Sequence, residues 1–168
     1  MFGFTRKNHI VMQASVEDHK AIAKLHGESF QRGWSTVEIE KLAANPSTTM
    51  LVARRVGVPP GSLSGFNIVR SAGSEAEILS IAVASRDRRH GIAEKLMREA
   101  IIRLRADRVE ALLLEVAENN LPAINLYKHF GFEIVGNRPG YYAPTVHTEG
   151  AAVEKQRAMA LVMRLDLV

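Results

Sequence analysis

The feature that most constrains the fold is a long apolar strand that runs into a basic, glycine-containing turn and then into an amphipathic helix. The run Ile78–Val83 is almost entirely apolar, which is typical of a strand buried on both faces. Gly91–Arg105 then places apolar residues at helical spacing, and Ala111–Val116 is a second apolar strand. A helix between two such strands indicates parallel pairing, because antiparallel neighbours need only a short turn. The sequence therefore predicts a parallel strand pair in the middle of a mixed sheet.

The rest of the chain supplies elements for a fold of α/β (α+β) type. Two N-terminal helices are predicted, after Ser15 and after Ser35, because each serine can cap a helix. The second helix is expected to carry Val37, Ile39 and Leu42. Strands are expected at 8–13, 48–55, 63–70, 75–84, 111–116, 132–135 and 157–167, with a further helix at 120–130. With 168 residues and no repeat or linker, residues 1–168 are expected to form a single domain.

The composition excludes several classes of protein. The chain contains no cysteine, so it can have no disulfide framework, thiolate metal site or cysteine nucleophile. The six histidines lack metal-ligand spacing, and no metal is predicted. No apolar run approaches the roughly 18 residues of a membrane helix, and the first residues do not resemble a signal peptide. We therefore expect a cytoplasmic protein without a membrane partner.

Positive charge is concentrated in and after the turn. Residues 86–108 hold eight basic and four acidic residues, an excess equal to the net charge of +4. The later arginines fit a solvated helix face with ion pairs, whereas the turn Arg86–Gly91 fits an anion site, because amides at a helix start bind phosphate. Gly91 permits close approach to a ligand, and the sequence matches neither a nucleotide P-loop nor a Rossmann fingerprint. A nucleic-acid surface is disfavoured, since aromatic residues make up only 6% of the chain.

Two segments resemble one enzyme family. Arg88–Ala93 resembles the Gln/Arg-x-x-Gly-x-Gly/Ala signature of the GNAT acetyltransferase superfamily, in which this turn cradles the diphosphate of acetyl-CoA. Asn120–Phe132 resembles the family's Asn-x-x-Ala-x-x-Leu-Tyr-x-x-x-Gly-Phe block. Three further features resemble the RimI-like N-terminal acetyltransferases, which act on ribosomal-protein alanine: Leu114-Glu115-Val116, Arg138–Tyr142 and Trp34-Ser35.

The resemblance implies a fold and a cosubstrate. The fold would be a GNAT-like single domain, with a mostly antiparallel central sheet, a splayed parallel pair of strands in its middle and helices on both faces. The cosubstrate would be acetyl-CoA, with no metal. The residues implied to bind it are Ile81, Ala82, Val83, Arg88, Arg89, His90, Gly91, Ile92, Ala93 and Asn120.

The catalytic roles carried over from the family fall on Glu115 and Tyr127. Glu115 is a lone carboxylate in an apolar strand and would take the proton of the substrate ammonium, whereas its structural alternative is pairing with an arginine. Tyr127 would protonate the departing thiolate, and its alternative is core packing beside Phe130. Asn120 could instead cap the helix that it begins. Val83 would supply a backbone amide to the thioester carbonyl.

The implied activity is direct N-acetyl transfer to a primary amine. The first expectation for the acceptor is a protein N-terminal α-amine, such as that of a ribosomal protein, bound by Trp34, Tyr141 and Tyr142. These aromatics could alternatively pack within their own loops. A small amine, a lysine side chain, an aminoacyl-tRNA and a non-catalytic acyl-CoA-binding role are the alternatives. A monomer or a homodimer is expected.

Overall fold

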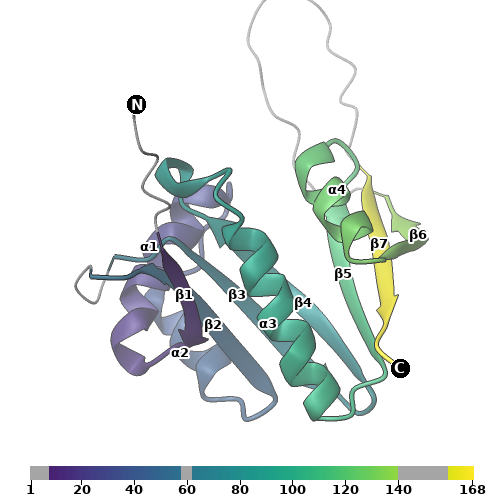
Figure 1. The fold of residues 1–168 in the computed structure, drawn as a ribbon, viewed down its shortest axis with the longest axis horizontal. Helices are drawn as coiled ribbons and strands as arrows, with labels where there is room; N and C mark the ends of the chain where they lie inside the picture. The colour runs from purple at the N-terminus through teal and green to yellow at the C-terminus, as the bar shows by residue number, and fades with distance from the viewer. Residues whose placement is uncertain (1–7, 58–61, 140–158) are drawn as a thin grey trace, which may run out of the picture.

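The computed structural model describes residues 8–57, 62–139 and 159–168. Within these residues, seven strands form one sheet in the order β1-β2-β3-β4-β5-β7-β6 (Figure 1). The strands are β1 (His9–Gln13), β2 (Thr48–Arg55), β3 (Gly65–Ala72), β4 (Glu75–Val83), β5 (Ala111–Ala117), β6 (Glu133–Arg138) and β7 (Ala160–Asp166). The helices are α1 (His19–Ser29), α2 (Thr36–Ala43), α3 (Ile92–Ala106) and α4 (Leu121–His129), with short 3-10 turns η1 (Val16–Asp18) and η2 (Ser85–Asp87).

The central strand pair is parallel, as the sequence predicts. β4 and β5 run in the same direction and are connected by α3, whereas the other neighbouring strands pair antiparallel. This mixed sheet confirms the predicted fold class. The position of β7 between β5 and β6 was not predicted, because the order of elements along the chain does not determine the order of strands in a sheet.

The parallel pair separates halfway along its length. Glu75–Ile78 pair with Ala111–Leu114, but β4 continues to Val83 and β5 continues to Ala117 without further pairing between them. Figure 1 shows the two strands together at one end and diverging toward α4. Because β5 stays paired with β7 along its whole length, the sheet divides into two halves from Leu79 and Glu115 onward.

A β-bulge in β4 lies where this separation begins. Ile68 pairs with Ser80, but the next residue, Val69, pairs with Ile78, so Leu79 has no partner on β3. An extra residue of this kind bends a strand and increases its twist. Within the apolar run, Ile78, Ser80 and Ala82 are buried but the alternate residues are only partly buried, so the strand is not buried on both faces as the sequence predicted. Ile81 lies beyond the last residue paired with β5 and stays partly exposed.

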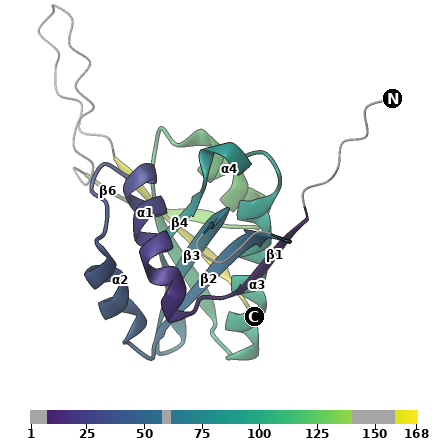
Figure 2. The same ribbon diagram turned by 90° about the vertical axis from the view of Figure 1, so that its left-hand side faces the viewer.

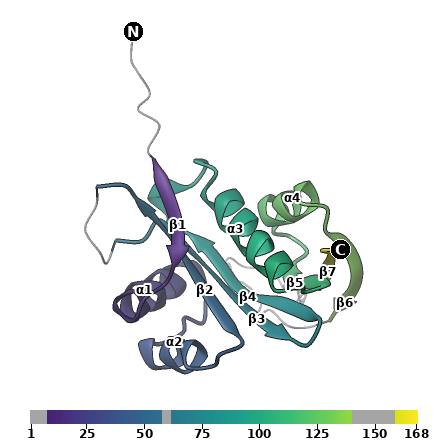
Figure 3. The same ribbon diagram turned by 60° about the horizontal axis from the view of Figure 1, so that its bottom comes forward.

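Helices cover both faces of the sheet, with α1 and α2 on one side and α3 and α4 on the other (Figures 2 and 3). Each pair closes its own hydrophobic core, built on Ile22 and Ile39 on one face and on Leu96 and Ile124 on the other. Of the apolar residues on α2, Ile39 is buried and Val37 is 57% exposed. A step of two residues along an α-helix rotates the side chain by about 200° around the helix axis. Val37 and Ile39 therefore point to different faces of α2. None of the described helices is long and apolar enough to cross a bilayer.

Candidate active site

The turn between β4 and α3 presents a row of free backbone amides. Gly91 is the N-cap of α3 with φ +71°, and Arg89 also has a left-handed backbone with φ +65°. No described residue accepts a hydrogen bond from the backbone amides of residues 89–93. Successive free amides at a helix start, aligned with the helix dipole, are suited to a phosphate group. The turn therefore fits the anion that the sequence predicts here and the diphosphate that the resemblance implies.

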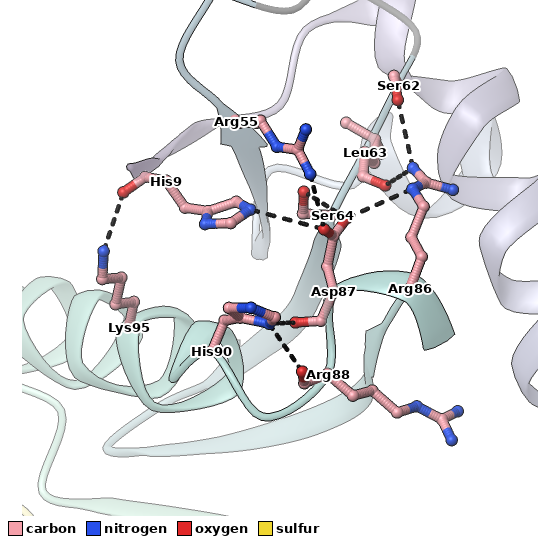
Figure 4. A network of polar contacts seen from close by, with 10 residues as sticks. All are labelled: His9, Arg55, Ser62, Leu63, Ser64, Arg86, Asp87, Arg88, His90 and Lys95. Atoms are coloured by element: carbon pink, nitrogen blue, oxygen red, sulfur yellow. Dashed lines mark hydrogen bonds and ion pairs between the residues drawn. The ribbon is translucent and has the colours of Figure 1, made fainter. Parts of the chain in front are cut away.

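The side chains of the turn leave these amides accessible. Arg88, Arg89 and His90 are all exposed. The Arg88 Nε atom donates to the carbonyl oxygen of Val83 at 3.4 Å, and His90 Nδ1 lies 2.8 Å from the Arg88 carbonyl oxygen (Figure 4). Ile92 is buried and anchors the first turn of α3 in the core, whereas Ala93 is partly exposed. A bound anion could thus meet both backbone amides and guanidinium groups at this turn.

The separated edge of β4 adjoins this turn. Ile81 and Val83 pair with Asn67 and Gly65 of β3 on one side, while β5 has already diverged on the other side. Ala82 points instead into the core beneath α1 and α2. Every second backbone amide and carbonyl of a strand points away from a given neighbour, so this edge can pair with an amide-rich ligand.

Glu115 is the first residue of β5 beyond the parallel pairing. Its side chain is 21% exposed, and its Oε1 atom lies 3.1 Å from the Arg138 Nε atom on β6. The structural alternative expected from the sequence, pairing with an arginine, is therefore present. The sequence indicated Arg138 only as part of the segment Arg138–Tyr142. Its place beside Glu115 follows from the strand order β5-β7-β6.

Glu115 lines a cavity of about 280 Å³. The floor is formed by the paired part of β4 and β5, and charged side chains form its walls. Two more ion pairs lie at this cavity: Arg70 with Glu77 at 3.4 Å, and Glu75 with Arg164 of the adjoining β7 at 2.7 Å. The side chain of Glu115 thus faces a partly enclosed polar space and not bulk solvent.

Tyr127 lies on the opposite face of β5. It is buried in the core beneath α3 and α4, with its ring centroid 5.7 Å from that of Phe132. Phe130 packs against the same core, so the packing alternative expected from the sequence is also present. Leu114 and Val116 belong to the same core, so the alternation of side chains along β5 directs Glu115 to the other face. The two predicted catalytic residues therefore flank β5 from opposite sides.

The remaining predicted residues have local structural roles. Asn120 is exposed and caps α4, its side-chain oxygen accepting a hydrogen bond from the Ala123 amide at 3.3 Å. Trp34, between α1 and α2, stacks on His26 with a centroid distance of 4.3 Å. Its backbone amide donates to His26 Nδ1 at 3.0 Å. Tyr141 and Tyr142 lie outside the described residues. Among the described residues, no group of three or more acidic or histidine side chains is arranged to hold a metal ion.

Comparison with known proteins identifies the family. The sequence profile of the Acetyltransferase (GNAT) family matches residues 19–132. The chain is 33% identical over 145 residues to the L-amino acid N-acetyltransferase AaaT of Escherichia coli (strain K12), covering 79% of this chain and 87% of that protein. It is 29% identical over 133 residues to a Bacillus subtilis (strain 168) protein provisionally named ribosomal protein bS18-alanine N-acetyltransferase, covering 79% and 85%.

The fold is also similar to that of a solved acetyltransferase structure. The crystal structure of the ribosomal-protein-S18-alanine N-acetyltransferase from Escherichia coli superimposes with a TM-score of 0.79 at 24% identity, covering 95% of this chain and 94% of that one. Family profile, relatives and fold agree on the resemblance to the GNAT family. The chain therefore belongs to the GNAT family of acetyltransferases and is an acetyl-CoA-dependent N-acetyltransferase.

Proposed function

We propose that this enzyme transfers the acetyl group of acetyl-CoA directly to the N-terminal α-amine of a protein, such as a ribosomal protein. The observation that carries the proposal is the separation of β4 from β5. The phosphate-binding turn and Tyr127 belong to the α3 and α4 side of this opening, and Glu115 faces the cavity on the other side. A thioester entering from one face could thus meet an amine entering from the other.

The proposed roles of Glu115, Val83 and Tyr127 together complete a direct transfer of the acetyl group. Glu115 takes a proton from the acceptor ammonium, directly or through a water molecule, and the amine then attacks the thioester carbonyl carbon. A backbone amide near Val83 stabilises the oxyanion. The new N–C bond forms as the C–S bond breaks, and the coenzyme A thiolate takes its proton from the hydroxyl group of Tyr127. The second ammonium proton, released from the new amide nitrogen, returns to the Tyr127 oxygen directly or through a water molecule. Because the chain has no cysteine, an acyl-cysteine intermediate is excluded.

The acceptor class is supported by the relatives and by the polar cavity. The Bacillus subtilis relative is named for ribosomal-protein alanine, and a further relative in Saccharolobus solfataricus is named N-alpha-acetyltransferase. The cavity beside Glu115 provides carboxylates for an ammonium group. Trp34, Tyr141 and Tyr142 would contact the peptide beyond its first residue.

A free α-amino acid is the second candidate acceptor, and one observation favours it. Glu115 and Arg138 place an anion and a cation 3.1 Å apart beside the cavity, which complements an α-ammonium next to an α-carboxylate. The Escherichia coli relative is named for L-amino acids. A peptide N-terminus has the same ammonium but a neutral carbonyl group in place of the carboxylate.

Mass spectrometry separates these acceptors. Purified protein is incubated with acetyl-CoA and either a panel of N-terminal peptides or the free L-amino acids. The proposal expects a gain of one acetyl group at the peptide α-amine, with kcat reduced at least tenfold in Glu115→Gln and in Tyr127→Phe. Acetylation of free amino acids alone would establish the second candidate, and near-wild-type rates in both variants would contradict the assigned roles. The cytoplasmic location and the monomeric or homodimeric state stay predictions.

A further inference from the structure

A buried aspartate without a role in the proposed chemistry lies at the base of the phosphate-binding turn. Asp87 is 2% exposed and ends η2, immediately before Arg88. A buried carboxylate is destabilising unless charged or polar groups surround it. Its contacts therefore indicate what it holds in place (Figure 4).

These contacts come from three different strands or their ends. The Ser64 hydroxyl group, just before β3, donates to Asp87 Oδ2 at 3.0 Å. The Arg55 Nη2 atom, at the end of β2, lies 3.5 Å from Asp87 Oδ1. The His9 Nε2 atom, on β1, lies 4.0 Å from the same oxygen. One carboxylate thus connects the start of the turn to the ends of β1, β2 and β3.

Two further contacts connect the turn to Asp87 and α3 to His9, one of the residues beside the Asp87 carboxylate. The His90 Nδ1 atom lies 3.2 Å from the carbonyl oxygen of Asp87, across the turn. The Lys95 Nζ atom, in the first turns of α3, donates to the carbonyl oxygen of His9 at 3.1 Å. Displacing Asp87 would therefore disturb both sides of the amide row that begins at Arg89.

Asp87 also divides the basic residues of this region into two groups. Arg55 and Arg86 both lie against its carboxylate, and Arg86 donates in addition to the carbonyl oxygen of Leu63 at 3.0 Å. Arg88 and Arg89 form no ion pair with any described carboxylate. The first group is engaged in structure, while the second can meet a bound anion.

The backbone conformation of the turn has to be held in place by contacts with the rest of the fold. Arg89 has φ +65°, a region that residues other than glycine rarely adopt, and Gly91 follows with φ +71°. A residue persists in this conformation only where its surroundings determine it. The anchored segment that ends at Asp87 lies two residues before the strained Arg89 and is part of those surroundings.

We propose that Asp87 is a positioning residue for acetyl-CoA: by anchoring the turn to β1, β2 and β3, it holds the amides of residues 89–93 in the geometry that binds the diphosphate. This inference rests on the proposed function, because it assumes that coenzyme A binds at this turn. It assigns Asp87 no contact with the substrate. Loss of the carboxylate should weaken binding through the diphosphate and leave binding through the pantetheine arm unchanged.

The test compares two ligands and two buried aspartates. Asp87→Asn keeps the size of the side chain and removes its charge. Asp18→Asn is the matched control, since Asp18 is 1% exposed and pairs with Arg54, the neighbour of Arg55 on β2, but lies before α1. The Kd of coenzyme A is measured by calorimetry, and the Kd of pantetheine, which lacks the diphosphate, by chemical-shift titration.

For Asp87→Asn we expect the Kd of coenzyme A to rise at least tenfold and that of pantetheine to change less than twofold. Asp18→Asn should lower the unfolding midpoint and leave the ratio of the two Kd values unchanged. If Asp87→Asn does not fold, Ser64→Ala removes one contact of the carboxylate and should raise the Kd of coenzyme A about threefold with the same selectivity. Equal changes for both ligands, or none, would overturn the inference. A wild-type protein that fails to bind coenzyme A would overturn the proposed function as well.

Discussion

Mild acid should destabilise this protein through His26. This residue is 4% exposed in α1, its ring stacks on Trp34, and its Nδ1 atom accepts the Trp34 amide. Burial lowers the pKa of His26 from 6.5 to about 4, against a smaller opposing effect of Glu38. A protonated ring would lose its acceptor at Nδ1 and place a charge among Phe30, Trp34 and Phe66.

The sign and size of the effect follow from linkage. The pKa is 6.5 in the unfolded chain and about 4 in the folded one, so acid protonates the unfolded state first. The contribution of neutral His26 is therefore complete above pH 6.5 and is lost as the pH falls toward 4. The difference of about 2.5 units corresponds to about 3 kcal/mol in the free energy of unfolding.

Urea unfolding followed by circular dichroism between pH 7.5 and 4 measures this loss. The comparison is with His26→Gln, which keeps a hydrogen-bond acceptor but does not titrate in this range. The free energy of unfolding should fall more steeply in the wild type, by about 3 kcal/mol over the interval. His129→Gln, at an exposed position of α4, should behave as the wild type. Parallel profiles for the wild type and His26→Gln would refute the reasoning.

Four further predictions concern the fold and the site. Gly65→Ala should destabilise the fold by about 1–3 kcal/mol in urea unfolding, because its Cβ would lie 2.9 Å from the Ala82 carbonyl oxygen and 3.1 Å from Leu96. Gly27→Ala, with open space in α1, should instead stabilise it by about 0.5–1 kcal/mol. Gly91→Ala, at φ +71°, should weaken coenzyme A binding in calorimetry, and an unchanged Kd would contradict the role of the turn. Arg138→Gln should lower kcat/KM for the amine acceptor and leave the Kd of coenzyme A unchanged, because Arg138 contacts Glu115 and not the turn. A higher Kd of coenzyme A in this variant would contradict the assignment of Arg138 to the acceptor side of the site.

Local patterns in the sequence predicted much of the fold. The apolar strands, the helical spacing of Gly91–Arg105 and the basic turn between them arise from interactions within a few residues. They led to the parallel pair and to the predicted anion site. Apolar character alone does not determine burial, because Val37 is 57% exposed although Ile39, two residues later, is buried. Periodicity thus fixes which residues form an element more reliably than which face they share.

The site itself depends on contacts between distant segments. Glu115 could be singled out as a carboxylate in an apolar strand, but its pairing with Arg138 depends on the order β5-β7-β6. The anchoring of Asp87 likewise depends on the ends of β1, β2 and β3 meeting at one place. No sequence period encodes such meetings, because they result from how the strands associate.

Sequence alone determined the elements, their chain order and the chemistry that a glycine turn before a helix can perform. The tertiary structure decided that the strand pair opens at the bulge of Leu79, and that Glu115 and Tyr127 lie on opposite faces of β5. The physical reason is that hydrogen-bonding propensity and apolar spacing act locally, whereas register, bulges and the facing of side chains across a sheet are set only when all strands pack together.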